Sequence, residues 1–567
     1  MSLFGAIQLA NTALRANEIA LQVTGQNIAN VNTPGYLRED VVLAPAPTQK
    51  QGGLLLGLGV QVEAVVQKID KFLEERLRGA VSDSANTQTT QGTYSQLEGL
   101  LSELSDSSLN SSLNRFFNSI SEILNQPESD SVRNMAVLQG ETLTRDMNRL
   151  ASRTAQLRAN VNDRIQSMAG DINRLVEQIR VLNVRIANTE GGALSKSDAV
   201  GLRDQRQQAL EDLSKLINIH AVEQPSGSVT VYAGGDFLVF EGNARQVKVN
   251  LSSDRGLTVA EIRLADTDAP LSPASGELRG LLDSRDKVLG DFLGQLDCFA
   301  STLAFEFNRI YSSGQGLNGF SQLTSQFEVD DSSKPLDAAG LKFTPANGSF
   351  QIIVHNKKTD LAQTSDIFVH LDGAARDTTL ADLAHALSGV PGNALSAQTT
   401  TDGRLTISST SPDLEFAFAN DTSGVLAALG LNTFFTGSNA SDLGVNAVVK
   451  ADPAKFAASR GGIGADTQTA VDLAKFIDRP IASQNGASLG ALYDRMSADT
   501  TQGSAIAQAA ADGAQVFETT LRGQKLSISG VNLDEETVNM ISYQRAYQAS
   551  AKYIATLIRL FDILVQI

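Results

Sequence analysis

The chain has 567 residues, more than one hydrophobic core usually organises, so several domain-sized units are expected. Apolar residues make up 42% of the sequence but aromatic residues only 5%, which favours a core of aliphatic side chains packed between helices. The formal net charge of -17 argues against nucleic acid or an anionic membrane surface as the main partner.

The first predicted element is a helix that ends at NIANVNTPGY, residues 27–36. Apolar residues recur in it at heptad positions, as in a coiled-coil seam. The seam consists of Leu3, Ile7, Leu14, Leu21 and Ile28. The helix must end before Pro34, because Thr33 is pushed toward extended geometry and Pro34-Gly35 suits a type II turn. No basic cluster precedes an apolar run here, so no secretory signal peptide is expected.

Residues 61–325, together with 456–527, are predicted to form a mainly helical, rod-like body. Alternating valines after Gly57 and Gly59 indicate a hairpin-rich segment at its start. A long helix is expected from about residue 132 to 188. VTVYAGGDFLVF predicts a β-hairpin near 228–249 because two alternating runs flank Gly-Gly. The lone Cys298 lies in an apolar helical pattern and is expected to serve packing.

Residues 326–455 differ in composition from the helical body. Thr, Ser, Gly and Asp increase, and short alternating runs such as SFQIIVHN and LEFAFAN replace the helical period. Only TLADLAHAL and VLAALGL resemble short helices. A β-rich module inserted into a mainly α protein is therefore predicted.

The last predicted helix begins after Asn532, a suitable N-cap that is followed by acidic residues in the first turn. Its heptad positions form a second apolar seam. This seam consists of Met540, Tyr547, Ile554, Leu557, Phe561 and Leu564. The final apolar window contains Arg559 and Asp562 and is shorter than a bilayer requires, so no membrane insertion is expected.

The two terminal helices can bury their seams against each other. Residues 1–60 with 528–567 are therefore predicted to form a terminal coiled-coil domain, with the rest of the chain nested between them as insertions. The last helix also carries apolar residues off its seam, including Ile558 and Leu560. One partner helix cannot cover these residues, so contacts with other subunits, and polymerisation, are expected.

No pattern in the sequence points to chemistry. The four histidines are isolated singletons, and no zinc-protease, paired-cysteine or nucleophile-elbow motif accompanies them. We therefore predict no catalytic, cofactor-binding or metal site, and a protein that is not an enzyme.

The stretch ANVNTPGY, residues 29–36, resembles the signature of the bacterial flagellar axial proteins of rod, hook and hook-filament junction. The turn residues that carry the resemblance are Asn30, Thr33, Pro34, Gly35 and Tyr36. The C-terminal SISGVNLDEETVNMISYQRAYQASAKYIATLIRLFDILVQI, and LRDQRQQALEDLSKLINI before the predicted hairpin, resemble the junction members of this family. The resemblance covers most of the chain.

This resemblance implies a structural protein that forms a ring of identical subunits at the distal end of the hook and permits filament attachment. Its implied partners are hook protein, a second junction protein and a cytoplasmic export chaperone on the C-terminal helix. The protein would be extracellular on the flagellum, after type III export through a transient cytoplasmic state. The alternatives are a flagellar hook or rod protein, a flagellum-associated peptidoglycan hydrolase, which needs an acidic pair in a cleft, and an adhesin, which needs a membrane anchor.

Overall fold

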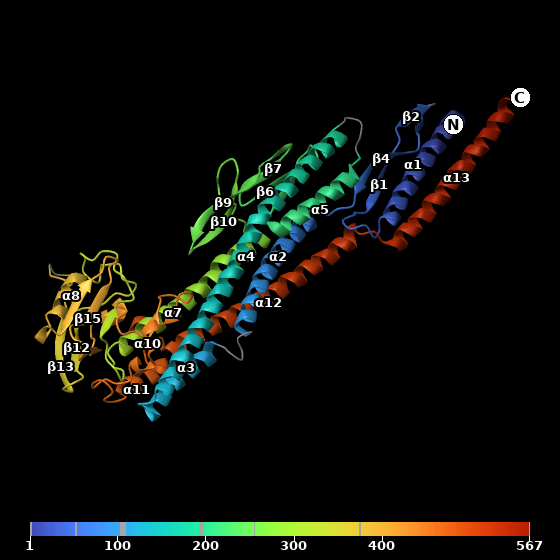
Figure 1. The fold of residues 1–567 in the computed structure, drawn as a ribbon. Helices are drawn as coiled ribbons and strands as arrows, with labels where there is room; N and C mark the ends of the chain where they lie inside the picture. The colour runs from blue at the N-terminus through green and yellow to red at the C-terminus, as the bar shows by residue number, and fades with distance from the viewer. Residues whose placement is uncertain are drawn as a thin grey trace. The chain divides into compact units, whose positions relative to one another are not determined.

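The structure is a computed structural model that describes residues 3–51, 54–102, 109–191, 197–254, 256–373 and 376–565. The chain divides into two compact units, each built from segments that are distant in sequence (Figure 1). The terminal unit comprises Met1–Thr93, Ala159–Arg285 and Ala505–Ile567. The central unit comprises Tyr94–Arg158 and Asp286–Ser504.

This grouping differs from the predicted three-part division, in which 61–325 and 456–527 formed one body. Three long helices carry the chain from one unit into the other without a break: α2 (Lys71–Ser102), α4 (Asp130–Glu190) and α12 (Leu489–Ser529). The predicted domain boundaries were placed where the composition changes. Most of the boundaries between the two units lie instead within these long helices.

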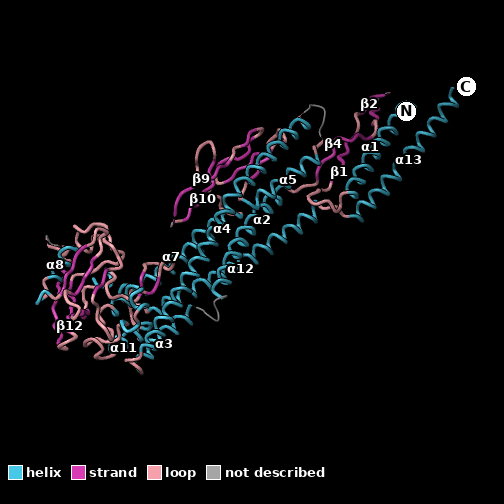
Figure 2. The backbone as a smooth tube through the Cα atoms, viewed as in Figure 1, coloured by secondary structure: helices cyan, strands magenta, loops and turns pink. Residues whose placement is uncertain are grey.

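The predicted fold class is confirmed. Long helices dominate the described chain, and most strands are gathered in two places, one in each unit (Figure 2). Both ends of the chain are long helices, α1 (Leu3–Ala29) and α13 (Leu533–Val565).

The terminal helices α1 and α13 lie side by side in the terminal unit (Figure 1). They run antiparallel, because Phe4 at the start of α1 contacts Phe561 near the end of α13, with ring centroids 6.5 Å apart. The predicted start of the last helix is also confirmed. The side chain of Asn532 accepts a hydrogen bond of 3.0 Å from the backbone N–H of Asp534 and caps the first turn of α13.

Two antiparallel strand pairs follow α1. The first joins β1 (Glu39–Pro45) to β4 (Val60–Gln67), and the second joins β2 (Thr48–Gln51) to β3 (Leu54–Gly57). The hairpin-rich segment predicted from the alternating valines is thus present. It fills the interval between the end of α1 and the start of α2.

The predicted β-hairpin at VTVYAGGDFLVF is confirmed as β6 (Val229–Ala233) paired with β7 (Asp236–Phe240). Gly234 and Gly235 both have positive φ, 60° and 94°, as a two-residue hairpin turn requires. The neighbouring elements are α5 (Val200–Leu216), β5 (His220–Glu223), β8 (Asn243–Ala244), β9 (Val247–Asp254), β10 (Leu257–Leu264) and α6 (Glu277–Asp283). Buried aliphatic side chains of α4, α5 and these strands form the core of the terminal unit.

Aromatic side chains fill the helical part of the central unit. Phe307 on α7 (Leu289–Tyr311) is fully buried and contacts the rings of Phe116, Phe434 and Phe435 at centroid distances of 5.1–5.6 Å. Aromatic rings therefore form a packed cluster at this point of a chain that has few of them. The surrounding helices are α3 (Leu109–Asn125), α10 (Ala447–Ala451) and α11 (Gln468–Ala474).

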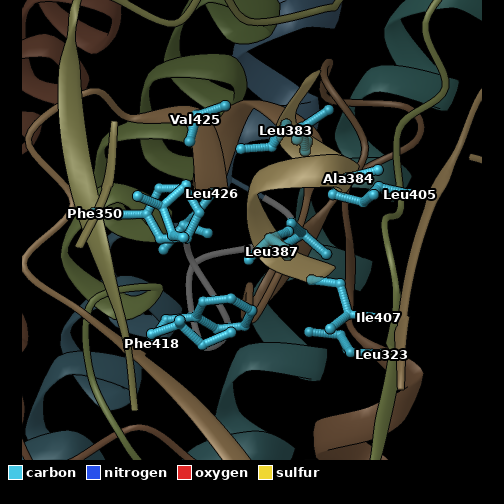
Figure 3. Close-up of a cluster of buried hydrophobic side chains, with 14 of the residues drawn as sticks. Leu323, Phe350, Leu383, Ala384, Leu387, Leu405, Ile407, Phe418, Val425 and Leu426 are labelled. Carbon is cyan, nitrogen blue, oxygen red and sulfur yellow. The ribbon is translucent and has the colours of Figure 1, made fainter. Parts of the chain in front are cut away.

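The β-rich region of the central unit contains two three-stranded sheets, in the orders β13-β12-β16 and β11-β15-β14. Their strands are β11 (Gln322–Thr324), β12 (Gly348–Asn356), β13 (Leu361–Val369), β14 (Leu395–Thr399), β15 (Leu405–Ser409) and β16 (Leu414–Ala419). A separate antiparallel pair joins β17 (Phe435–Thr436) to β18 (Gly444–Val445). Both predicted short helices are present, as α8 (Leu380–Ser388) and α9 (Val425–Leu429). Leu383 and Leu387 of α8 lie between Phe350 on one sheet and Ile407 on the other (Figure 3).

The expectation that Cys298 serves packing is wrong. Its side chain is exposed. The buried face of α7 follows Phe292, Leu296, Phe299 and Leu303, and Cys298 lies outside that stripe.

Candidate functional site: the terminal helices and the turn motif

The turn after α1 has the geometry that the sequence predicts. The backbone N–H of Tyr36 donates to the carbonyl of Thr33 at 3.2 Å, and Gly35 has a φ of 79°. These values fit a type II turn with glycine at its third position. The hydroxyl of Thr33 donates to the side chain of Asn30 at 3.1 Å, which closes the end of the helix.

The chain after the turn folds back onto α1 through Asn27, a buried residue in the last turns of that helix. The Tyr36 hydroxyl donates to Asn27 Oδ1 at 2.9 Å, as does the backbone N–H of Glu39. Asn27 Nδ2 donates to the Glu39 carbonyl at 3.0 Å. Burial, and then the nearby carboxylates, raise the pKa of Tyr36 well above its ordinary value, so the phenol remains a donor.

Arg38 connects this folded-back segment to the junction between α12 and α13. Its backbone N–H donates to the carbonyl of Ser529, the last residue of α12, at 2.9 Å. Its guanidinium pairs with Glu535 and Glu536 in the first turn of α13, each at 2.7 Å. We name Arg38, Ser529, Glu535 and Glu536 the Arg38 clamp, because one residue holds both sides of the break at Gly530.

Glu536 is the critical carboxylate of the Arg38 clamp. Its side chain is 2% exposed, whereas that of Glu535 is 58% exposed. Asn27 Nδ2 also donates to Glu536 Oε2, at 3.3 Å. Burial alone would lower the pKa of Arg38, but the hydrogen bond that Arg38 donates to Glu535 and the charges of both glutamates raise it, so the cation persists.

A second carboxyl group, that of Asp204 on α5, contacts the segment after the turn. Asp204 Oδ1 accepts from Gln67 Nε2 at 2.5 Å, and the carboxyl group also accepts from the backbone of Leu37. Burial, reinforced by the charge of Glu39, raises the pKa of Asp204 to about 7. The contact between α5 and the turn is therefore sensitive to pH near neutrality.

We expect the stability of the terminal unit to fall as pH rises from about 4 to about 7. In that range folded Asp204 retains a proton that the unfolded chain has already released, so deprotonation favours unfolding. The Asp204→Asn variant should lose this pH dependence and exceed the parent protein in stability at pH 8. Urea titrations across the pH range measure both effects. Asp212→Asn, the same change elsewhere on α5, should keep the parent slope; a flat parent profile would contradict the assignment.

The predicted seam of α1 lies beside the most buried ridge of the helix. Ile7, Leu14, Leu21 and Ile28 are half-buried in the described subunit. The fully buried positions include the smaller Ala6, Ala10, Ala16 and Ala20. The larger side chains of the seam therefore keep part of their surface exposed in the described subunit. The side chain of Leu3 lies outside the described part of the structure.

The predicted seam of α13 is graded in exposure. Leu557 is buried, Tyr547 and Ile554 are half-buried, and Met540 and Phe561 are 37% and 42% exposed. The side chain of Leu564 lies outside the described residues. Other large apolar side chains of α13 are also exposed: Leu533, Val538, Ile541, Tyr553, Ile558, Leu560 and Ile563. Contact with α1 therefore leaves much of the apolar surface of α13 open.

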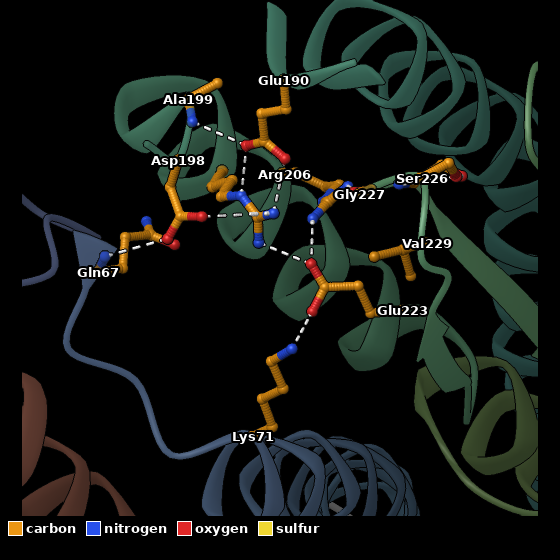
Figure 4. Close-up of polar contacts among 12 residues, drawn as sticks. Gln67, Lys71, Glu190, Asp198, Ala199, Arg206, Glu223, Ser226, Gly227 and Val229 are labelled. Atoms are coloured by element: carbon orange, nitrogen blue, oxygen red, sulfur yellow. Dashed lines mark hydrogen bonds and ion pairs between the residues drawn. The ribbon is translucent and has the colours of Figure 1, made fainter. Parts of the chain in front are cut away.

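A polar network connects α5 to the strands next to it (Figure 4). Glu190 accepts two hydrogen bonds of 2.7 Å from the Arg203 guanidinium and one from the backbone of Ala199. Arg203 also donates to Glu223, which pairs with Lys71 at the start of α2. Every charge in this network has a partner of opposite sign. We therefore assign the network a structural role, in which it holds the start of α2 against α5 and β5.

The described residues contain no group of three side chains suited to a metal ion. Of the histidines, His355 lies between Glu415 and Asp360, whose carboxylates raise its pKa, and His220 pairs with Glu75. In that same part of the chain, no helix is long and apolar enough to cross a membrane.

The reasoning from sequence missed Asn27, Arg38 and the pairing role of Glu536. Their contacts join residues about 500 positions apart, which local periodicity cannot detect. Adjacent acidic residues at the start of α13 were interpreted as partners of the helix dipole alone. An arginine two residues after the turn, combined with that acidic pair, is the signal that was available.

Three family models match the chain. The model for the flagellar hook-associated protein FlgK helical domain matches residues 94–327. The C-terminal model of flagellar basal body rod FlgEFG proteins matches residues 522–567, and that of flagella basal body rod proteins matches residues 7–36. The two end matches fall on α1 with its turn motif and on the end of α12 with α13. They define the class as an axial protein of the bacterial flagellum.

Similar proteins narrow this class. The chain is 25% identical to flagellar hook-associated protein 1 of Salmonella typhimurium (strain LT2), with 99% of each chain covered. It is 28% identical to that of Bacillus subtilis (strain 168), over 68% of this chain and 81% of the relative. The chain is therefore similar to flagellar hook-associated protein 1 over nearly its whole length. The flagellar hook junction protein FlgK from Burkholderia pseudomallei is 14% identical with a TM-score of 0.49, covering 80% of this chain and 100% of that one.

Proposed function

We propose that this chain is a structural component of the flagellum, an adapter that forms a ring of identical subunits at the distal end of the hook and permits filament attachment. The observation that carries the proposal is the similarity over nearly the whole chain to relatives named flagellar hook-associated protein 1. The surface of the terminal helices supports it, because such a ring needs apolar helix faces that one subunit leaves uncovered.

The terminal helices supply the assembly surface in this proposal. In one subunit, α1 and α13 lie side by side and leave Leu14, Leu21, Tyr547 and Ile554 only half-buried. Neighbouring subunits would cover these residues, together with the exposed apolar side chains of α13. Burial of such residues contributes about 25 cal/mol per Å² of apolar surface, so even partial cover of two long helices favours polymerisation.

The turn motif would set the direction in which α1 leaves the body of the subunit. Asn30, Thr33, Pro34, Gly35 and Tyr36 form a compact turn that is held at both sides by Asn27 and the Arg38 clamp. A rigid turn at this point fixes the assembly helices relative to the rest of the terminal unit. We also propose that the β-rich module of residues 326–455 faces outward from the ring.

The partners we propose are further copies of the chain, hook protein, a second junction protein and, before type III export, a cytoplasmic chaperone that covers α13. A helix with this much exposed apolar surface requires such cover to remain soluble. The location follows as the extracellular hook-filament junction. A hook or rod protein, or a peptidoglycan hydrolase, is less well supported because the long relatives carry the hook-associated protein 1 name, and we propose no enzymatic activity.

A gene deletion in the source bacterium tests this proposal. We expect hooks without filaments in electron micrographs, and flagellin shed into the medium, because filament subunits would lack their attachment ring. Expression of the intact chain from a plasmid should restore filaments. Intact filaments in the deletion strain, or loss of the hook itself, would reject a junction role.

A further inference from the structure

A cavity of about 510 Å³ in the central unit is lined by three arginines. It lies between the end of α7, the loop after β16 and the short 3-10 turns Phe476–Asp478 and Ala482–Gln484. Arg309, Arg460 and Arg479 contribute to its wall, and Phe476 and Ile481, both buried, contribute apolar surface. Three cations around one cavity are unusual in a chain with a net charge of -17.

The carboxylates that line this cavity already have donors. Asp421 accepts backbone N–H bonds from Ser423, Gly424 and Leu426 at 2.8–3.0 Å, at the start of α9. Glu306 accepts from the hydroxyl of Ser483 at 2.7 Å and from Arg309 at 3.1 Å. Both lining carboxylates are therefore already paired with donors of the protein.

The guanidinium groups, by contrast, keep most of their donors. Arg309 donates to Glu306, and Arg460 pairs with Asp472. Within the described part of the chain, the Arg479 guanidinium makes neither an ion pair nor a side-chain hydrogen bond. Each guanidinium carries several N–H groups in a planar fork, which matches the oxygen atoms of a carboxylate or phosphate.

We propose that this cavity binds a small oxyanion, with Arg479 and Arg460 as its main contacts. The excess of donors over free acceptors selects an anion. The volume lies within the range of small-molecule sites, and the buried Phe476 and Ile481 keep the wall in place before the ligand arrives. The proposal goes beyond the structural role of the chain in the flagellum.

Calorimetric titration of the full-length soluble protein with citrate, and separately with inorganic phosphate, tests the proposal. Sodium chloride at equal ionic strength is the control for screening. We expect saturable binding of at least one anion at one site per chain. Binding of citrate alone identifies a carboxylate ligand, and binding of phosphate alone identifies a phosphate ligand; either result supports the site.

Two variants assign the binding to the cavity. Arg479→Gln and Arg460→Gln should each weaken binding at least fivefold, whereas Arg495→Gln, an exposed arginine of α12, should bind like the parent protein. Circular dichroism verifies that each variant is folded. Absence of saturable binding, or equal affinity in the cavity variants and the control, would overturn the proposal. Because the titration uses unassembled protein, its outcome is independent of the junction role.

Discussion

Replacing Arg38 by alanine is expected to lower the free energy of unfolding of the terminal unit by about 3–5 kcal/mol, the usual effect of breaking a buried ion pair. The substitution leaves Glu536, whose side chain is 2% exposed, without its cation. Only the weaker hydrogen bond from Asn27, at 3.3 Å, would remain on that carboxylate. Urea titration, and amide hydrogen exchange on residues 529–545, measure the loss.

The exposed partner provides the matched control for this prediction. Glu535→Gln removes a carboxylate that is 58% exposed, so it should cost less than about 1 kcal/mol. Combining Arg38→Ala with Glu536→Gln should recover part of the loss, because no buried charge is then left unpaired. Equal effects of Arg38→Ala and Glu535→Gln would show that the buried pair contributes little.

The double variant Pro34→Ala/Gly35→Ala is expected to abolish filament attachment while the subunit still folds. Gly35 has a φ of 79°, and an added Cβ would lie 3.0 Å from Gln208 Oε1. An alanine there costs about 1–2 kcal/mol in the left-handed region, which a chain of this size tolerates. However, the substitution would change the direction of the chain between α1 and β1. A ring requires that α1 leaves the body of every subunit in the same direction.

Filament counts and swimming of the deletion strain carrying the variant measure this effect, and circular dichroism of the purified subunit verifies folding. Pro47→Ala/Gly57→Ala makes the same two changes in the neighbouring strand segment, where Gly57 has open space around its Cβ position. This control should support normal filaments. Normal junction assembly by the Pro34→Ala/Gly35→Ala variant would show that the turn is incidental.

Local patterns of the sequence were sufficient for several elements. The heptads at both ends predicted α1 and α13, Asn532 marked the start of α13, and Gly234-Gly235 marked a hairpin turn. Each of these features depends on residues within a few positions of one another. Local preferences of the backbone therefore determine these elements without any tertiary contact.

Other features depend on contacts that no local pattern contains. Within α1, the small Ala6 and Ala20 are buried more deeply than the large heptad residues, an order that the apolar pattern does not contain. Cys298 shares an apolar segment with buried neighbours yet lies off their stripe on α7. The Arg38 clamp unites opposite ends of the chain and is visible only once they are folded together.

The terminal unit has a consequence for the order in which the protein folds. Its three segments are separated by the residues of the central unit, and the pair of Arg38 with Glu535 spans 497 positions. A contact between residues so far apart in sequence forms slowly from an extended chain. The entropic cost of bringing the two ends together decreases once the intervening residues are compact. The α1–α13 pair should therefore be the last structure to form, and a chain whose C-terminal segment is not yet free has α1 without its partner helix.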